Sequence, residues 1–409
     1  MNEMLELPQL STAERDRRWK AVREAMLTQK LDCLIVYGAN SSWDSRIANV
    51  RYLTQIGGNG EQAWVIFPLT GEPVCFTSFA WINDWWHYSQ SWVKNVRPIQ
   101  KSWAFSIAEI LKERGLEKGN IGVVGLPGLF DREGWIPFMT YKQIIEELPS
   151  ANLVNATTLV EAVRMIKSSE EITCLEKAGE LGDLIWNTMV KTAKPGVKER
   201  IVYGKMLETM LSNGGEYPTL FLWESGSSPL PHPFFLVTDR VLQKNDIISV
   251  EVHPKYNGYL SHQERAFCLG KPQKEIRYIY DIAQQCFDHA LKMLTPGMEL
   301  EKYVAAIRQP IYDAGLDFVE AGIHGHGLES PEYPTIQSPL QKKPLESGNP
   351  AMITVDTTLK VGMVFALIFD LIDPKYKDGK TGAALADTVL VTETGSRRLN
   401  KYPMDILGK

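Results

Sequence analysis

The chain has 409 residues, of which 44% are hydrophobic and 23% charged, with a formal charge of -5. This composition predicts a folded protein of two or three domains, and the small acidic charge argues against nucleic acid as the main partner. There is no apolar run long enough to cross a membrane and no apolar leader, so we expect neither a membrane span nor a signal peptide. Five scattered cysteines without a Cys-x-x-Cys pair favour a reducing cytoplasm.

The first 160 residues alternate between helical and strand-like patterns. Residues 13–30 have the pattern of an amphipathic helix, and short apolar strands are predicted at 33–37, 64–67 and 122–124. Such alternation is typical of an α/β domain. We therefore expect an N-terminal α/β domain over residues 1–160.

Tryptophan is concentrated in this first part of the chain. Nine of the eleven tryptophans precede residue 140, and Trp81, Trp85 and Trp86 lie close together in sequence. Crowded tryptophans usually fill a core. The spacing of these three also fits the wall of a ligand site, and the sequence leaves both alternatives open.

A second region, residues 161–409, begins with a strong helix signal. Ser168-Ser169-Glu170-Glu171 has the capping-box pattern, and apolar residues follow at helical spacing. A helix, Pro-Gly, helix arrangement occurs at 195–196 and again at 296–297, each time followed by a strand-rich stretch. The repetition is weak, and it favours a duplicated α+β domain.

One predicted hairpin in this region brings polar residues together. Two strand-like runs flank Asn257-Gly258, which is the strongest short signal for a type I′ turn. With these two residues in the turn, each residue of one strand pairs with the residue of the other strand that is equally far from the turn, and alternate side chains share a face. Directly opposed Cβ atoms are then ~5 Å apart and diagonal ones ~7 Å. The face carries Glu251 opposite Glu264 and His253 opposite His262.

Other histidines lie in unusual contexts on either side of the hairpin. His232 stands in Pro229-Leu230-Pro231-His232-Pro233, a rigid extended segment that suits a positioned proton-transfer group. His324 and His326 alternate with glycines in residues 322–328, where glycine permits close backbone approach. A loop or structural histidine is the plainer interpretation of each. Together with the hairpin they indicate a site.

At these residues the chain resembles the methionine aminopeptidase, prolidase and creatinase superfamily. The resemblance covers nearly the whole chain, and it is carried by Val250-Glu251, Asn257-Gly258-Tyr259, Glu264-Arg265, His324-Gly325-His326-Gly327-Leu328, Gly362-Met363-Val364-Phe365 and Asp387-Thr388-Val389. It implies an α+β protein with a creatinase-type N-terminal α/β domain (1–160) and a pseudo-symmetric pita-bread catalytic domain (161–409). It also implies a homodimer.

Peptidases of that superfamily hold two metal ions with Asp, Asp, His, Glu and Glu. By the resemblance, these positions are occupied here by Glu251, His262, His324, Ile368 and Ala386. Isoleucine and alanine have no ligand atom, and the family's second catalytic histidine is replaced by Pro331. We therefore expect the two-metal peptidase centre to be lost.

Creatinase is a member of this superfamily that works without metal. The resemblance places its proton-shuttling histidine at His232 and its substrate-gripping glutamate at Glu264, while its second glutamate falls at Ile368. The leading hypothesis is therefore a creatinase-like, non-peptidase hydrolase that cleaves a C–N bond in a small polar nitrogen-containing metabolite other than creatine. His232 is the expected general acid/base, Glu264 binds or polarises the substrate, and His324 and His326 line the pocket.

Further substrate contacts are expected from both parts of the molecule. The catalytic domain supplies Glu251, His262 and Asp370. The N-terminal domain of the neighbouring subunit, by the family arrangement, supplies Arg46, Arg51 and Trp85.

The metal content stays open between two alternatives. Either no metal is needed, or a single iron, zinc or manganese ion is held by Glu251, His262 and His324, a set of two imidazoles and one carboxylate. Asp370 would add a ligand or orient an imidazole. Three other functions also remain possible on sequence grounds: an inactive small-molecule-binding protein, a one-metal lyase, decarboxylase or oxygenase, and a residual aminopeptidase or prolidase.

Overall fold

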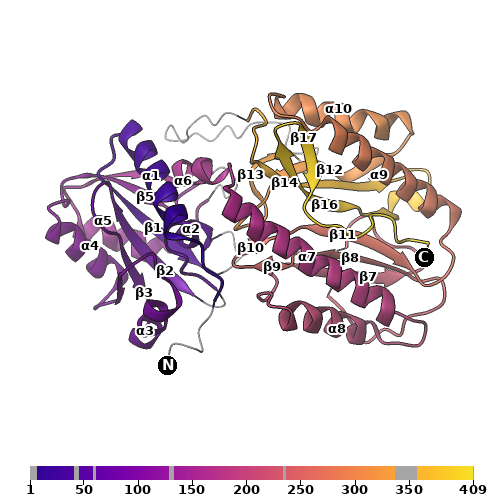
Figure 1. Cartoon of the computed structure of the whole chain (residues 1–409), viewed down its shortest axis with the longest axis horizontal. Helices are drawn as coiled ribbons and strands as arrows, with labels where there is room; N and C mark the ends of the chain where they lie inside the picture. The colour runs from indigo at the N-terminus through magenta and orange to yellow at the C-terminus, as the bar shows by residue number, and fades with distance from the viewer. Residues whose placement is uncertain are drawn as a thin grey trace. The chain divides into compact units, whose positions relative to one another are not determined.

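The computed structural model describes residues 7–40, 46–58, 61–128, 133–233, 236–336 and 357–408. The chain divides into two compact units, with the change after Met165 (Figure 1). The first unit contains residues 7–165 and 328–333, and the second contains the remaining described residues. Both combine helices with sheets, as an α+β fold requires. None of the helices in the described ranges is long and apolar enough to cross a membrane.

The first unit is built on a six-stranded mixed sheet in the order β4-β3-β2-β1-β5-β6. Its strands are β1 (Cys33–Ala39), β2 (Gln62–Pro68), β3 (Val74–Thr77), β4 (Asn95–Pro98), β5 (Asn120–Val124) and β6 (Asn152–Asn155). Its helices are α1 (Thr12–Thr28), α2 (Ala48–Thr54), α3 (Ala80–Ser89), α4 (Trp103–Glu113), α5 (Phe138–Glu147) and α6 (Thr157–Arg164). The helix and three strands expected in this part of the sequence are all present.

The second unit contains a larger sheet whose order is β13-β12-β14-β16-β11-β8-β7, with β15 beside β14 and β17 beside β16. Its strands, with a separate two-stranded ribbon β9–β10, are β7 (Phe221–Gly226), β8 (Ile247–Val252), β9 (Lys255–Tyr256), β10 (Tyr259–Leu260), β11 (Gln263–Cys268), β12 (Asp317–Gly325), β13 (Glu332–Ile336), β14 (Val364–Ile372), β15 (Gly382–Ala383), β16 (Ala386–Thr392) and β17 (Gly395–Arg398).

Four long helices accompany this sheet in two packed pairs, α7 with α8 and α9 with α10 (Figure 1). Their bounds are α7 (Ser169–Thr192), α8 (Glu199–Ser212), α9 (Lys274–Met293) and α10 (Leu300–Asp313), and a short 3₁₀ turn, η3, spans Lys377–Gly379. The capping box predicted at the start of α7 is confirmed: the Glu171 N–H donates to Ser168 Oγ at 3.2 Å, and the Ser168 N–H donates to Glu171 Oε2 at 3.0 Å.

The predicted hairpin is confirmed in detail. Asn257 and Gly258 have φ values of 48° and 81°, which a type I′ turn requires, and Tyr256 pairs with Tyr259. The same register continues into β8 and β11, where Glu251 pairs with Glu264. Because the register does not change across the ribbon, the turn decides which residues of both strands share a face.

A single row of paired residues crosses the large sheet at Glu251. Each member is paired with the next on the neighbouring strand, so the row lies on one face of the sheet: Leu222, Glu251, Glu264, Ala386, Ile368 and Gly322. The row is polar on β8 and β11 and apolar on β16 and β14. Ala366, Ile368 and Ala386 form a small buried apolar cluster at its apolar side.

Helix α7 holds β11 from the opposite face. Gln263 lies between His262 and Glu264 in sequence, so it points away from them. Its Oε1 accepts from Trp186 Nε1 at 2.6 Å, and its Nε2 donates to the Gly179 carbonyl at 3.3 Å. A Cβ at Gly182 would come within 2.2 Å of the Gln263 side chain. The glycine therefore permits this close approach of helix and strand.

Candidate active site

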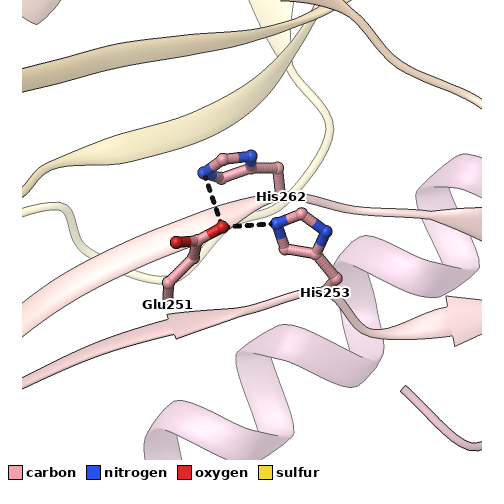
Figure 2. Close-up of side chains that lie close together, drawn as sticks. All are labelled: Glu251, His253 and His262. Carbon is pink, nitrogen blue, oxygen red and sulfur yellow. Dashed lines mark hydrogen bonds and ion pairs between the residues drawn. The ribbon is translucent and has the colours of Figure 1, made fainter. Parts of the chain in front are cut away.

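Three buried side chains around the hairpin meet at one carboxylate oxygen. Glu251 Oε1 lies 2.7 Å from His253 Nε2 and 3.7 Å from His262 Nε2. Figure 2 shows both rings directed at this oxygen from neighbouring strand segments. The His253 and His262 ring centroids are 4.5 Å apart, as the predicted register requires. One ligand atom from each residue lies within 4.8 Å of the others, which is close enough for a common metal ion.

His232 joins this cluster through the other oxygen of Glu251. Its Nε2 lies 3.4 Å from Glu251 Oε2, and its Nδ1 lies 2.7 Å from Asp370 Oδ2 and 3.7 Å from Glu264 Oε1. His232, Glu251 and Glu264 form a second group whose ligand atoms lie within 4.8 Å. The contact with Asp370 fixes the orientation of the imidazole ring, which leaves Nε2 directed at the site.

The position of His232 is also fixed through its own backbone segment. Glu224 on β7 accepts a hydrogen bond from the Leu230 N–H at 2.9 Å, two residues before the histidine. Burial raises the pKa of Glu224 to about 7. This carboxyl group therefore ties the proline-rich segment to the sheet edge beside the cluster.

The carboxyl groups of the cluster are buried close to one another. Burial, and secondly the nearby charge of Glu264, raise the pKa of Glu251 well above its usual range. The same two causes raise the pKa of Asp370. Burial by itself lowers the pKa of His232, but the carboxylates of Glu251, Glu264 and Glu320 outweigh it, and the net pKa is raised. Full ionisation of these carboxyl groups therefore needs a compensating positive charge.

Two other histidines of the site are held in the neutral form. Burial lowers the pKa of His262 well below its usual range, and the neighbouring His253 and His324 lower it further. The pKa of His326 is lowered in the same way, first by burial and then by His253 and His324. His262 Nδ1 and both ring nitrogens of His326 have no hydrogen-bond partner among the residues described. Neutral imidazoles next to acidic groups are the form that binds divalent metals.

The expected site residues are distributed over both units. The second unit brings together His232, Glu264, Glu251, His262 and Asp370, with His326 beside the imidazoles. The His324 ring lies 5.4 Å from that of His262, and His324 Nδ1 is hydrogen-bonded to the Gly325 carbonyl at 2.8 Å. His324 belongs to neither group of converging ligand atoms found in the described residues, whereas His253 belongs to one of them.

His253 was not included among the expected ligands, although the hairpin register had placed it on the same face. The signal that identifies it is its spacing of two residues from Glu251, which puts the two side chains side by side. Arg46, Arg51 and Trp85 lie in the first unit, on or next to α2 and α3. Of these three, Trp85 lines a cavity of that unit.

Both parts of the chain match known protein families. Residues 173–393 match metallopeptidase family M24, and residues 18–166 match the creatinase/prolidase N-terminal domain. The first match covers more than half of the 409 residues. The chain belongs to metallopeptidase family M24. This confirms the creatinase, prolidase and aminopeptidase superfamily and its pita-bread fold.

Named relatives of this M24 protein include an Xaa-Pro dipeptidase from Pyrococcus furiosus, 28% identical over 67% of this chain and 74% of the relative. The probable dipeptidase PepE of Mycobacterium tuberculosis is 30% identical over 62% of this chain and 63% of the relative. The prolidase structure from Pyrococcus horikoshii OT3 matches with a TM-score of 0.74 at 21% identity, covering 96% of this chain and all of that one. The X-Pro aminopeptidase structure from Thermotoga maritima matches with a TM-score of 0.76 at 17% identity, covering 96% of this chain and 99% of that one.

The expectation of a creatinase-like, non-peptidase C–N hydrolase is therefore wrong. The chain belongs to a metallopeptidase family, and the relatives found along it are named dipeptidases. The prediction treated the loss of ligand atoms at Ile368 and Ala386 as the loss of the whole class of activity. In the structure His253 and Glu264 place further ligand atoms beside Glu251, so the polar half of the site is not lost with Ile368 and Ala386.

The residues present fit one divalent cation in this M24 protein. Acidic groups that raise one another's pKa and neutral imidazoles with unpartnered nitrogens both indicate a site for positive charge. The fit is confined to the polar half of the row, because Ala386 and Ile368 offer no ligand atom.

Proposed function

We propose that this chain is a metal-dependent peptidase that hydrolyses the amide bond of short peptides, with one divalent ion held by Glu251, His253 and His262. The observation that carries the proposal is the convergence of these three ligand atoms within 4.8 Å on one sheet face of an M24 domain. The names of the relatives support a dipeptide as the substrate class. Two imidazoles with one carboxylate suit zinc, manganese or iron(II).

When bound, such an ion polarises the amide carbonyl and favours ionisation of water. The protein's own groups then manage the protons. His232 is oriented by Asp370 through Nδ1, so its Nε2 is the atom that faces the site. The nearby carboxylates raise its pKa, which favours the protonated imidazole and suits donation to the leaving nitrogen.

The overall reaction balances with one water molecule. A C–O bond forms, the C–N bond breaks, one proton of water remains on the new acid, and the other reaches the amine by way of His232. Glu264, 3.1 Å from His262 Nε2 and 3.7 Å from His232 Nδ1, is placed to accept a proton from water.

A panel of dipeptides tests this function directly. The protein, treated with EDTA and then supplied separately with manganese, zinc or iron(II), is incubated with Xaa-Pro and non-proline dipeptides, and released amino acids are measured. We expect hydrolysis that requires added metal. Tight binding of a metal without hydrolysis of any dipeptide would contradict the proposed activity, and undiminished activity after exhaustive EDTA treatment would contradict the metal.

We further propose that the protein acts on its small substrate as a homodimer. The support is the resemblance, which implies a homodimer, together with exposed aromatic side chains of the N-terminal unit such as Tyr88 (58% exposed) and Phe138 (76% exposed). Light scattering at micromolar concentration is expected to give twice the mass of one 46.2 kDa chain. A mass of one chain would contradict the dimer and leave the proposed activity standing.

A further inference from the structure

The aromatic residues of α3 are arranged on an exposed part of the first unit. Trp81 and Trp85 are one helical turn apart, so they lie on the same side of the helix. Trp81 is 70% and Trp85 37% exposed, whereas Trp86 is buried. The rings of Trp85 and Trp86 are 4.5 Å apart at an angle of 78°, which gives two aromatic surfaces at nearly a right angle.

These rings line a cavity of about 330 Å³. Its other walls come from Gly57, Gly58 and Glu61, which precede β2, and from the helix itself. The lining residues are Gly57, Gly58, Glu61, Trp81, Ile82, Trp85 and Trp86. The volume is at the lower end of the range for small-molecule sites, so it suits a compact ligand. None of the lining residues belongs to the histidine and glutamate cluster of the second unit.

A buried carboxylate forms one wall of this cavity. Glu61 is 7% exposed; its Oε2 accepts from Trp86 Nε1 at 2.8 Å, and its Oε1 accepts from the Gln62 N–H at 3.0 Å. Each carboxylate oxygen can accept a further hydrogen bond. Burial raises the pKa of Glu61, so a positive charge in the cavity would stabilise its ionised form.

The aromatic faces favour the same sign of charge as the carboxylate. The face of an indole ring carries partial negative charge and attracts cations within about 6 Å. Among the described residues, no lysine or arginine lies over the ring of Trp81, Trp85 or Trp86, although other rings of this unit have such partners. The aliphatic part of the Arg51 side chain lies beside Gly57 at the rim of the cavity. Because an arginine favours an anion, the test must compare the binding of a cation with that of an anion.

We propose that Trp81, Trp85, Trp86 and Glu61 form a binding site for a small organic cation, an alkylammonium or quaternary ammonium group. The rings surround the apolar substituents of the cation, and Glu61 neutralises its charge. This site goes beyond the proposed peptidase activity, because it requires neither the metal cluster nor hydrolysis.

Three probes of nearly the same shape test the charge requirement by calorimetry on the full chain. Choline carries a quaternary nitrogen, 3,3-dimethylbutan-1-ol has a neutral carbon in its place, and 3,3-dimethylbutanoate is an anion. We expect choline to bind at least roughly tenfold more tightly than the alcohol, as desolvated cation–π and charge contacts imply. Equal binding of choline and the alcohol, preferred binding of the anion, or no choline binding would overturn the proposal.

Matched variants locate the site. Glu61→Gln should weaken choline binding roughly tenfold, and Trp81→Leu and Trp85→Leu roughly threefold to tenfold each, whereas Trp85→Phe should keep most of the affinity. Phe138→Leu is the control, because Phe138 is exposed in the same unit and does not line the cavity. Should Glu61→Gln fail to fold, Trp81→Leu decides alone, since an exposed side chain can be replaced without unfolding.

A second copy of the chain covering these rings is the competing occupant. If the Trp81→Leu variant becomes monomeric while choline binding by the unaltered protein is absent, the aromatic face is an interface between copies, and the cation site is excluded.

Discussion

The two halves of one sheet row differ in chemistry although their backbones are paired without interruption. On β8 and β11 the row carries Glu251 and Glu264, and on β16 and β14 it carries Ala386 and Ile368. All four side chains are buried. Ligand atoms are therefore concentrated on the hairpin half. The other half supplies apolar packing, and this lowers the local dielectric around the buried charges.

On the function proposed here, a metal centre keeps one ion although some of its ligand positions have become apolar. The hairpin alone gathers two carboxylates and two imidazoles, because a type I′ turn fixes the register of both its strands. The apolar half supplies no ligand atom to this cluster.

The largest expected effect comes from removing the proton-transfer groups of the polar half. His232→Ala and Glu264→Gln should each lower kcat for the dipeptide substrate by ~10²–10⁴-fold, the usual value of general acid/base assistance. Steady-state kinetics with saturating metal measures the change. His289→Ala is the matched control, because His289 is exposed on α9. Near-full activity of either site variant, with an unaltered circular dichroism spectrum, would show that its assigned role is wrong.

The asymmetry of the row can be removed by a double substitution. Ile368→Glu/Ala386→Glu places two carboxyl groups in the buried apolar half and should destabilise the metal-free protein by about 3–5 kcal/mol, because the new charges are unpaired. Divalent metal should restore much of this loss and raise the bound metal from one ion to two, measured by urea unfolding and elemental analysis.

The neutral pair Ile368→Gln/Ala386→Gln is the control for size and polarity, and its stability should not respond to metal. A folded Glu double variant that still binds a single ion would mean that the apolar half lacks room for a second ion.

A third comparison distinguishes the two candidate imidazole ligands. Glu251→Gln and His253→Ala should each weaken metal binding by at least the roughly 10–100-fold seen when a supporting group is lost. His324→Ala should weaken it less, because the residue is outside both groups of converging ligand atoms found in the described residues. Competition with a metal-binding dye gives the affinities. A larger loss for His324→Ala than for His253→Ala would reverse the assignment.

The smallest expected effect concerns stability and pH at the edge of the polar half. The pKa of Glu224 is about 7 in the folded protein, above its ordinary value, so the folded state retains a proton that the unfolded state releases. The free energy of unfolding should therefore fall as pH rises from about 4.5 to 7. Glu224→Gln removes this fall and should gain roughly 1–2 kcal/mol above pH 7, after allowance for solvent screening.

Urea unfolding of both proteins at pH 5 and pH 8 measures this difference. Glutamine can still accept the Leu230 N–H, so the segment before His232 should keep its position. An equal stability difference at the two pH values would mean that Glu224 ionises normally.

Much of the polar half was predictable from sequence, because it depends on local structure. Asn257-Gly258 fixes the hairpin, and the hairpin places Glu251, His253 and His262 together. The apolar half depends on strands more than a hundred residues away, and its pairing of Ile368 with Ala386 follows from the strand order of the whole sheet. Sequence periodicity contains no information on such non-local order.

The contact between His232 and Asp370 was predictable only in part. The sequence indicated that Asp370 shares a strand face with position 368 and can orient an imidazole, but it did not indicate which one. The choice is made by the path of the proline-rich segment, which the Glu224 contact to Leu230 helps to fix. The function was predicted wrongly for a different reason, because the absence of two family ligands was taken to mean the absence of peptidase activity.

The close approach of α7 to β11 has a consequence for how such a site can be adjusted during evolution or by engineering. Gly182 lets the helix approach until Trp186 and Gln263 are hydrogen-bonded, and Gln263 stands between His262 and Glu264. A larger residue at position 182 must displace the Gln263 side-chain amide and its hydrogen bond to Trp186. This removes a support from the strand residue between an imidazole and a carboxyl group without altering either of them. Reactivity could thus drift through changes on the rear of the sheet, in a helix that supplies no ligand, and surveys restricted to pocket residues would miss them.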